Sequence, residues 1–288
     1  MTNGFIIIDK PTGTTSNDAV MRAKRLLRPK KIGHTGTLDP MASGVLVLAL
    51  GEATKAIPYM TDTDKAYVFN IKFGASTSTD DAAGEITGRS DKIPALSEIE
   101  SALCRFIGNI TQVPPKFSAI LINGRRAYDL AREGGEFEMK GRAQSVRSLK
   151  ILRQIQPDEV QLEVEADRGF YVRSLARDIA AACGSLGHAS LIRRIRAGAF
   201  SIGDAIPLDN LTESAHNGAA DVRNIIVDIT RGLDGIPVLE IDDTELRQGR
   251  AVESSALPGL YQIRSNNRFS LIARAEGGLL KPERVFNP

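Results

Sequence analysis

The chain of 288 residues has few side chains that form disulfides or bind metals. Its two cysteines, Cys104 and Cys183, are far apart and belong to no C-x-x-C pair, so we expect two reduced thiols. The three histidines are widely separated, and no two lie three or four positions apart, as ligands on a zinc-binding helix do. The sequence therefore predicts neither a disulfide framework nor a metal site.

Sequence motifs that hold nucleotides are also missing. No Gly-Lys dipeptide occurs, and neither G-x-x-x-x-G-K-[ST] nor G-x-G-x-x-G is present, which argues against a P-loop or a dinucleotide-binding fold. No run approaches the roughly 20 apolar residues that cross a bilayer. The first ten residues contain too few apolar side chains for a secretory signal. We therefore expect a cytoplasmic protein that contacts no membrane.

The composition is that of a folded protein, with 42% hydrophobic and 25% charged residues. The length allows one large domain and a small one. A net charge of +2 neither requires nor excludes a nucleic-acid partner. Local clusters of charge must therefore decide which class of partner the chain binds.

One carboxylate, Asp39, lies in the glycine-rich segment 33–44, which is the most informative stretch of the chain. Pro40 fixes its own backbone and disfavours the helical region for Asp39, so we expect a defined loop. An apolar run at 45–50 indicates a buried strand after the loop, and 22–31 contains six cations before it. An isolated aspartate is most often a turn former, but these neighbours favour a carboxylate that acts on a polyanionic substrate.

Periodicity predicts the elements of an α+β fold with a mixed, largely antiparallel sheet. A segment at 113–146 reads as an excursion from this core, and 237–288 as a small β-rich module after a domain at 1–233. We expect strands at 4–9, 45–50, 66–73, 145–155, 159–167 and 198–202, and helices at 16–28, 53–60, 97–106 and 169–182. Thr15 or Ser16 is expected to cap the first helix, 75–84 to form a polar loop, and the excursion to be partly helical around 127–132.

Several polar and aromatic residues allow two interpretations each. Asp80 and Asp81 fit solvated turn acids as well as a functional site, and Tyr67 and Tyr171 fit buried core tyrosines. The basic run at 193–196 fits either a solvated helix end or a set of guanidinium groups that bind phosphates. Residue type alone does not decide between these readings.

Short motifs follow one another along residues 10–194 in a fixed order, and together they resemble one known family. They are Lys10-Pro-x-Gly13-x-Thr15-Ser16, His34-Thr-Gly-Thr-Leu-Asp39-Pro-x-Ala-x-Gly44, Gly51-Glu-Ala-Thr-Lys55, Lys65-Ala-Tyr67, Thr77-x-Thr79-x-Asp81-x-x-Gly84, Pro114-Pro-x-Phe117-Ser118-Ala119, Asn123-Gly124-x-Arg126-Ala127-Tyr128, Gly169-x-Tyr171-Val-Arg173, Leu186-Gly-x-Ala189 and Arg193-Arg194. This series resembles the TruB family, the bacterial-type tRNA pseudouridine-55 synthases. Two positions depart from the family pattern: Ser78 stands where an aspartate is expected, and Ile192 where a leucine is usual.

The resemblance implies a sheet of the pseudouridine synthase type with flanking helices, an RNA-gripping insertion at 113–146 and a short PUA-like module at 237–288. The implied reaction isomerises uridine 55 in the tRNA T loop: the N-glycosidic bond breaks, the base turns, and it rejoins through carbon. It needs no cofactor or metal. The implied partner is tRNA, bound by a monomer that requires no protein partner.

The resemblance also assigns roles to individual residues. Asp39 is the essential carboxylate, and either attacks the sugar or removes a sugar proton to give a glycal. Arg173 pairs with that carboxylate, Tyr67 stacks on the target base, and His34 occupies the space that the flipped base leaves. Residues implied in substrate binding are His34, Lys55, Asp81, Tyr171, Ile192, Arg193 and Arg194.

Other functions stay open at this point. A related synthase that modifies another RNA would carry the same motifs, although such relatives have a larger C-terminal RNA-binding region. A non-catalytic RNA-binding or tRNA-folding protein would have no need of Asp39. A sugar- or nucleotide-hydrolysing enzyme is disfavoured because no second catalytic carboxylate is evident.

Overall fold

A computed structural model describes residues 3–60, 64–135, 137–217 and 223–287, with the side chains of 213–217 excepted. The described chain forms two compact units. Unit 1 comprises Met1–Asp39, Val45–Thr63 and Ala197–Pro288, and unit 2 comprises Pro40–Gly44 and Asp64–Arg196. The units are defined by contacts between residues, and they do not coincide with the domains predicted at 1–233 and 237–288. Those domain boundaries stay a prediction.

Unit 1 is built around two strands whose apolar side chains are buried. β1 (Gly4–Lys10) pairs in parallel with β14 (Ile206–Pro207), and β3 (Ser43–Leu50) pairs antiparallel with β2 (Ile32–His34). The continuous apolar runs in β1 and β3 predict strands that are covered on both faces. Every residue from 45 to 50 is less than 1% exposed, which confirms this expectation.

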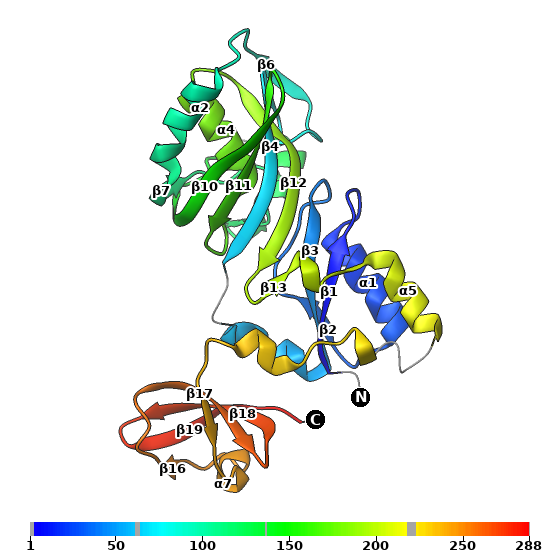
Figure 1. Cartoon of the computed structure of the whole chain (residues 1–288), viewed down its shortest axis with the longest axis vertical. Helices are drawn as coiled ribbons and strands as arrows, with labels where there is room; N and C mark the ends of the chain where they lie inside the picture. Colours follow the sequence, from blue (N-terminus) through cyan, green and yellow to red (C-terminus); the bar gives the residue numbers. More distant parts are fainter. Residues whose placement is uncertain (1–2, 61–63, 136, 218–222, 288) are drawn as a thin grey trace. The chain divides into compact units, whose positions relative to one another are not determined.

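Two helices of unit 1 lie side by side, α1 (Ser16–Leu27) and α5 (Leu208–Asn217) (Figure 1). The helix α1 begins with a capping box, in which Thr15 accepts from the Asp18 backbone and the Asp18 carboxylate accepts from Thr15. Arg22 joins the two helices through an ion pair of 2.7 Å with Asp209. The sequence allowed Thr15 or Ser16 as the cap, and the structure selects Thr15.

The C-terminal part of unit 1 is a five-stranded sheet in the order β15-β17-β18-β19-β16. Its strands are β15 (Val238–Glu240), β16 (Val252–Glu253), β17 (Gly259–Ser265), β18 (Arg268–Glu276) and β19 (Leu279–Val285), with the short helix α7 (Thr244–Arg247). One set of side chains, including Leu246 and Leu271, forms the core of this sheet. Ile272 and Phe286 instead join Phe5 in the core of the N-terminal part. The β-rich module is therefore packed into unit 1.

Unit 2 contains a sheet in the order β12-β4-β11-β10-β7, whose neighbours from β4 onward are antiparallel. Its strands are β4 (Lys65–Phe73), β7 (Gly108–Gln112), β10 (Arg142–Gln156), β11 (Glu159–Ala166) and β12 (Gly187–Ala197). Helix α4 (Val172–Ala182) packs against β4, and α2 (Leu96–Leu103) packs against β10 and α4 (Figure 1). Parallel and antiparallel pairs together confirm the mixed α+β sheet.

Three local predictions need correction. The basic residues 193–196 lie within β12, so the reading as a solvated helix end is wrong. The expected helix at 53–60 is two 3-10 turns, η1 (Gly51–Lys55) and η2 (Ile57–Tyr59), because Pro58 removes a backbone donor. The expected loop at 75–84 begins as the strand β5 (Ala75–Thr77), which forms a hairpin with β6 (Ile86–Arg89).

The insertion at 113–146 holds a short hairpin of β8 (Leu121–Ile122) and β9 (Arg125–Arg126), followed by α3 (Ala127–Arg132). The helix has the bounds that the sequence predicts. Across the described residues, no helix combines the length and apolar character that crossing a bilayer requires.

Gly44 ends the glycine-rich segment at a point where only glycine fits. Its φ is +100°, and a Cβ placed there would lie 2.1 Å from the backbone oxygen of Arg194 in the paired strand β12. Both the backbone conformation and the close approach of a neighbouring strand therefore exclude a side chain.

We predict that Gly44→Ala is strongly destabilising. Gly13 is the matched control, because its φ is +87° but a Cβ there meets nothing within 4 Å. Gly13→Ala should lower the free energy of unfolding by about 1–2 kcal/mol for the left-handed backbone alone. Gly44→Ala should lower it by at least about 2 kcal/mol more, because backbone must move. Equal melting temperatures of the two variants would contradict the close packing at Gly44.

Candidate active site

Asp39 sits on a loop that a buried hydroxyl holds from the start of α1. The Ser16 hydroxyl donates to the Leu38 carbonyl at 2.9 Å and accepts from the Leu38 N–H at 2.8 Å. Both Ser16 and Leu38 are less than 5% exposed. Leu38, the residue directly before Asp39, is therefore fixed by two hydrogen bonds that are buried away from water. Asp39 itself is half-buried.

The turn that leads into α1 is held in a similar way. The Lys10 side chain is fully buried, and its ammonium group donates to the carbonyls of Pro11 and Thr14 at 3.0 and 2.6 Å. A buried ammonium group needs several such partners. Lys10 thus fixes the turn at 11–14, and with it the helix start at which Ser16 lies.

His34, the other predicted site residue near this loop, is the last residue of β2 and pairs with Leu48 of β3. The next backbone N–H, that of Thr35, donates to the Val47 carbonyl at 3.1 Å. His34 is half-buried. The β2–β3 ladder therefore anchors the beginning of the loop that Ser16 holds further along.

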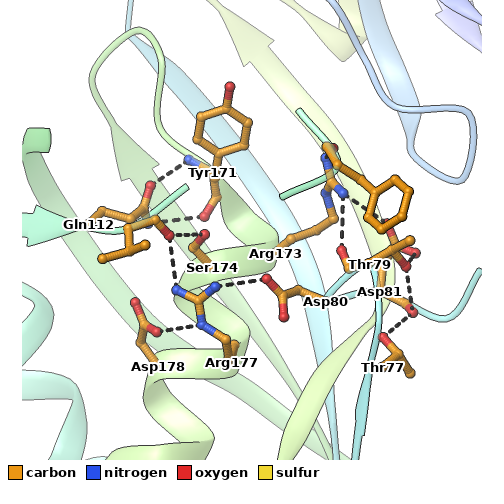
Figure 2. Close-up of polar contacts among 12 residues, drawn as sticks. Thr77, Thr79, Asp80, Asp81, Gln112, Tyr171, Arg173, Ser174, Arg177 and Asp178 are labelled. Carbon is orange, nitrogen blue, oxygen red and sulfur yellow. Dashed lines mark hydrogen bonds and ion pairs between the residues drawn. The ribbon is translucent and has the colours of Figure 1, made fainter. Parts of the chain in front are cut away.

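In unit 2, the centre of the predicted site is the buried side chain of Arg173, in the first turn of α4 (Figure 2). Its Nη1 donates to the Thr79 carbonyl at 3.0 Å and lies 3.5 Å from the Asp81 carboxylate. Its Nη2 donates to the Phe117 carbonyl at 3.1 Å. The guanidinium group thus links the loop after β5 to the base of the insertion, a geometry that a lysine cannot reproduce.

Asp81 is itself held by its neighbours. Its Oδ1 accepts from the Thr79 hydroxyl at 2.6 Å and from the Ala83 N–H at 3.0 Å. The Asp81 residue is only 4% exposed. This placement favours a role in positioning Arg173 over the direct RNA contact that the resemblance implies.

A second arginine, Arg177, repeats this pattern one helical turn later and was missed by the sequence reasoning. It donates to Asp80 at 2.8 Å, to Asp178 at 2.8 Å and to the Val113 carbonyl at 2.9 Å (Figure 2). Burial raises the pKa of the Asp80 carboxyl, and the charge of Arg177 opposes this rise. The spacing of four from Arg173 is the one sequence signal for it.

The two tyrosines have different settings. Tyr67 lies on β4 opposite Val164 of β11 and is 7% exposed. Tyr171 directly precedes α4, and the Gln112 side chain binds both its N–H, at 2.8 Å, and its carbonyl, at 3.0 Å. Tyr67 thus matches a core tyrosine in burial, whereas the backbone of Tyr171 is fixed and the residue as a whole is half-buried.

The remaining predicted residues are largely engaged within the fold. The Lys55 ammonium group pairs with Glu52 at 2.5 Å and donates to the Val285 carbonyl at 3.2 Å, which ties η1 to the end of β19. Ile192 and Arg194 on β12 are 4% and 1% exposed. Of the residues on β12 that we expected to bind substrate, only Arg193 is partly accessible.

The predicted set divides between the units: Asp39, His34 and Lys55 belong to unit 1, and the others to unit 2. Among the described residues, no three His, Cys, Asp or Glu side chains are close enough together to hold a metal ion. The side chain of His216 lies outside the described part.

Known proteins are similar to this chain over almost its whole length. The family model for "TruB family pseudouridylate synthase (N terminal domain)" matches residues 24–172. A tRNA pseudouridine synthase B of Caulobacter sp. (strain K31) is 42% identical over 99% of this chain and 96% of its own length. A protein of that name from Ruegeria pomeroyi is 42% identical over 99% and 95%.

Solved structures of the same fold include a chain of a Cbf5-Nop10-Gar1 complex. It matches with a TM-score of 0.75 at 25% identity, over 99% of this chain and 85% of that chain. A chain of an H/ACA RNP bound to a substrate RNA has the same TM-score at 23% identity, which shows the fold alone. From the motifs, the fold and these matches together, the chain is an isomerase that belongs to the TruB family of pseudouridylate synthases.

Proposed function

We propose that the chain isomerises uridine to pseudouridine at position 55, in the T loop of tRNA. The observation that carries this proposal is the 42% identity to proteins named tRNA pseudouridine synthase B over 99% of the chain. The reaction breaks the bond between N1 of the base and the sugar and forms one from C5 to the same sugar carbon. The hydrogen on C5 leaves as a proton and N1 takes up a proton, so the product is an isomer of the substrate. No electrons are gained or lost, so no redox partner is required.

Asp39 is the carboxylate that enables this reaction, and it acts in its ionised form. A carboxylate that attacks the sugar or removes a sugar proton must reach one atom of the substrate with little motion. The two hydrogen bonds between Ser16 and Leu38 support this role because they fix the backbone next to Asp39. Both chemical routes are compatible with such a loop.

The target uridine has to leave its stack, which costs a few kcal/mol. In our proposal Tyr67 stacks on the flipped base, an interaction worth roughly 1–3 kcal/mol, and His34 fills the space that the base leaves. Arg173 favours the ionised form of Asp39 and orients it. Tyr171 lies beside the flipped base, and Arg193 contacts RNA phosphate.

The main alternative is a related synthase that acts on another RNA, with protein partners. The solved Cbf5 chain in the complex with Nop10 and Gar1 is only 25% identical to this chain, and the match covers 85% of the Cbf5 chain. Relatives at 42% identity that are matched over 96% of their length favour tRNA. We therefore propose a cytoplasmic monomer that requires no protein partner.

We predict that Asp39→Asn abolishes pseudouridine formation, because an amide has neither the charge nor the basicity of a carboxylate. Unmodified tRNA is incubated with the wild type, with Asp39→Asn and with the exposed control Asp234→Asn, and pseudouridine is mapped by carbodiimide treatment and primer extension. The wild type and Asp234→Asn should modify position 55, and Asp39→Asn should not.

Two results of that experiment would contradict the proposal. Modification by the wild type only outside the T loop would overturn the substrate assignment. Product from Asp39→Asn at the wild-type rate would overturn the role of the carboxylate.

We predict that Arg173→Lys lowers the turnover rate much more than tRNA affinity, because the charge remains but the fork that meets Asp81 and two carbonyls is lost. Arg177→Lys is the matched control, since it removes a similar three-partner fork from the next turn of α4. Single-turnover rates and dissociation constants are compared for both variants. Equal losses of rate and affinity in Arg173→Lys, or equal rates in the two variants, would refute the assigned role.

A further inference from the structure

Unit 1 also carries a cluster of cations to which the proposed catalytic roles assign no function. Between Asp18 and Asp39 the chain has six cations and no acidic residue. The rest of the chain therefore holds 31 of the 37 Lys and Arg residues against all 35 Asp and Glu residues. Without this short segment the chain would be net acidic.

Five of these six cations are exposed, and none of the five has a carboxylate partner among the described side chains. Arg22 is the exception, because it pairs with Asp209. Within the described ranges, no Asp or Glu side chain lies in ion-pair distance of the other five, which we call the basic turn. They are Lys24, Arg25, Arg28, Lys30 and Lys31.

Several cations elsewhere on the surface of this protein pair with carboxylates. Arg250, Arg274 and Lys281 on the C-terminal sheet and its flanking turn all lie near a glutamate, at 2.9, 2.5 and 3.8 Å. Lys92 and Lys150 in unit 2 also pair with glutamates, both at 3.0 Å. Other exposed cations in the described part of the chain, such as Arg89 and Arg168, also have no ion pair. The basic turn differs from them because its five unpaired cations fall within eight residues.

The backbone holds these five charges close together. Arg28 ends α1 in a left-handed conformation, with φ of 44°, and its N–H donates to the Lys24 carbonyl at 3.0 Å. The Lys31 carbonyl accepts from the Gly51 N–H at 2.8 Å, and the next residue enters the β2–β3 ladder. The cations therefore lie on an ordered frame and repel one another without the relief that a flexible tail would give.

Stabilisation of the helix end explains only part of this arrangement. Lys24 and Arg25 lie in the last turn of α1, where cations interact favourably with the helix dipole. That effect falls off within one turn, so it gives no reason for Lys30 and Lys31, which follow the helix. An anion bound from outside would relieve the repulsion of the whole group.

We propose that the basic turn binds the phosphate backbone of the RNA substrate, as a site distinct from the pocket that receives the base. This inference rests on the proposed function, since it takes the substrate to be RNA. Exposed Lys and Arg side chains without carboxylate partners release condensed counterions from RNA without first breaking an ion pair. The segment continues through β2 into the loop that carries Asp39, so RNA held here is held by the element that presents the carboxylate.

The test is a charge-neutralised variant, K24Q/R25Q/R28Q/K30Q/K31Q, measured for binding to unmodified tRNA at several salt concentrations. Each phosphate contact contributes roughly 0.7–0.9 to the slope of log affinity against log salt. We expect the slope to become shallower by about 2 or more, and the dissociation constant at 0.1 M salt to rise at least about ten-fold. A double variant, K30Q/K31Q, lies outside the helix and should lower the slope by about 1–2, which keeps the test valid if the fivefold variant is unstable.

The matched control removes the same formal charge from paired cations, as K92Q/K150Q/R250Q/R274Q/K281Q. Its salt slope should stay within about 0.5 of the wild type if contacts, and not net charge, determine binding. An equal weakening by the control would overturn the proposal, and so would a wild-type slope in both variants of the basic turn. Wild-type pseudouridine formation on the same tRNA is measured in parallel, so that failure of the proposed function is recognised separately.

Discussion

The arrangement of the catalytic loop depends on the pair of hydrogen bonds between the Ser16 hydroxyl and the backbone of Leu38. One hydroxyl group satisfies both a buried N–H and a buried carbonyl, and leaving either unpaired would cost about 1–3 kcal/mol. This interaction joins the first turn of α1 to a residue 22 positions later. Glycines give the loop its turns, but the hydroxyl group determines where the residue before Asp39 lies.

In unit 2, charged side chains hold the loops in place. Arg173 and Arg177 project from successive turns of α4, and each meets at least one acid and one backbone carbonyl (Figure 2). The carbonyls belong to the loop after β5 and to the base of the insertion, which are far apart in sequence. One helix therefore fixes two loops, and the residues that surround it serve position as much as contact with substrate.

The sequence predicted what local patterns encode. Alternating side chains specified β4, and the helix at 127–132 in the insertion had the predicted bounds. It did not predict β12, because Arg194 is buried there and a charged side chain is expected to be exposed. It also missed the partner of Arg177, since Asp80 is 97 positions away. Motif order named the site residues, whereas their hydrogen-bond partners depend on contacts that no local pattern records.

The central claim is that the Ser16 hydroxyl positions Asp39 for chemistry, and Ser16→Ala tests it most directly. Thr15 still caps α1 in this variant, so the helix start is retained. Ser185→Ala, which removes another buried hydroxyl that donates to a carbonyl, controls for lost stability. The account predicts that Ser16→Ala lowers the single-turnover rate at saturating tRNA at least about ten-fold more than the control does. Equal rates in the two variants would contradict it.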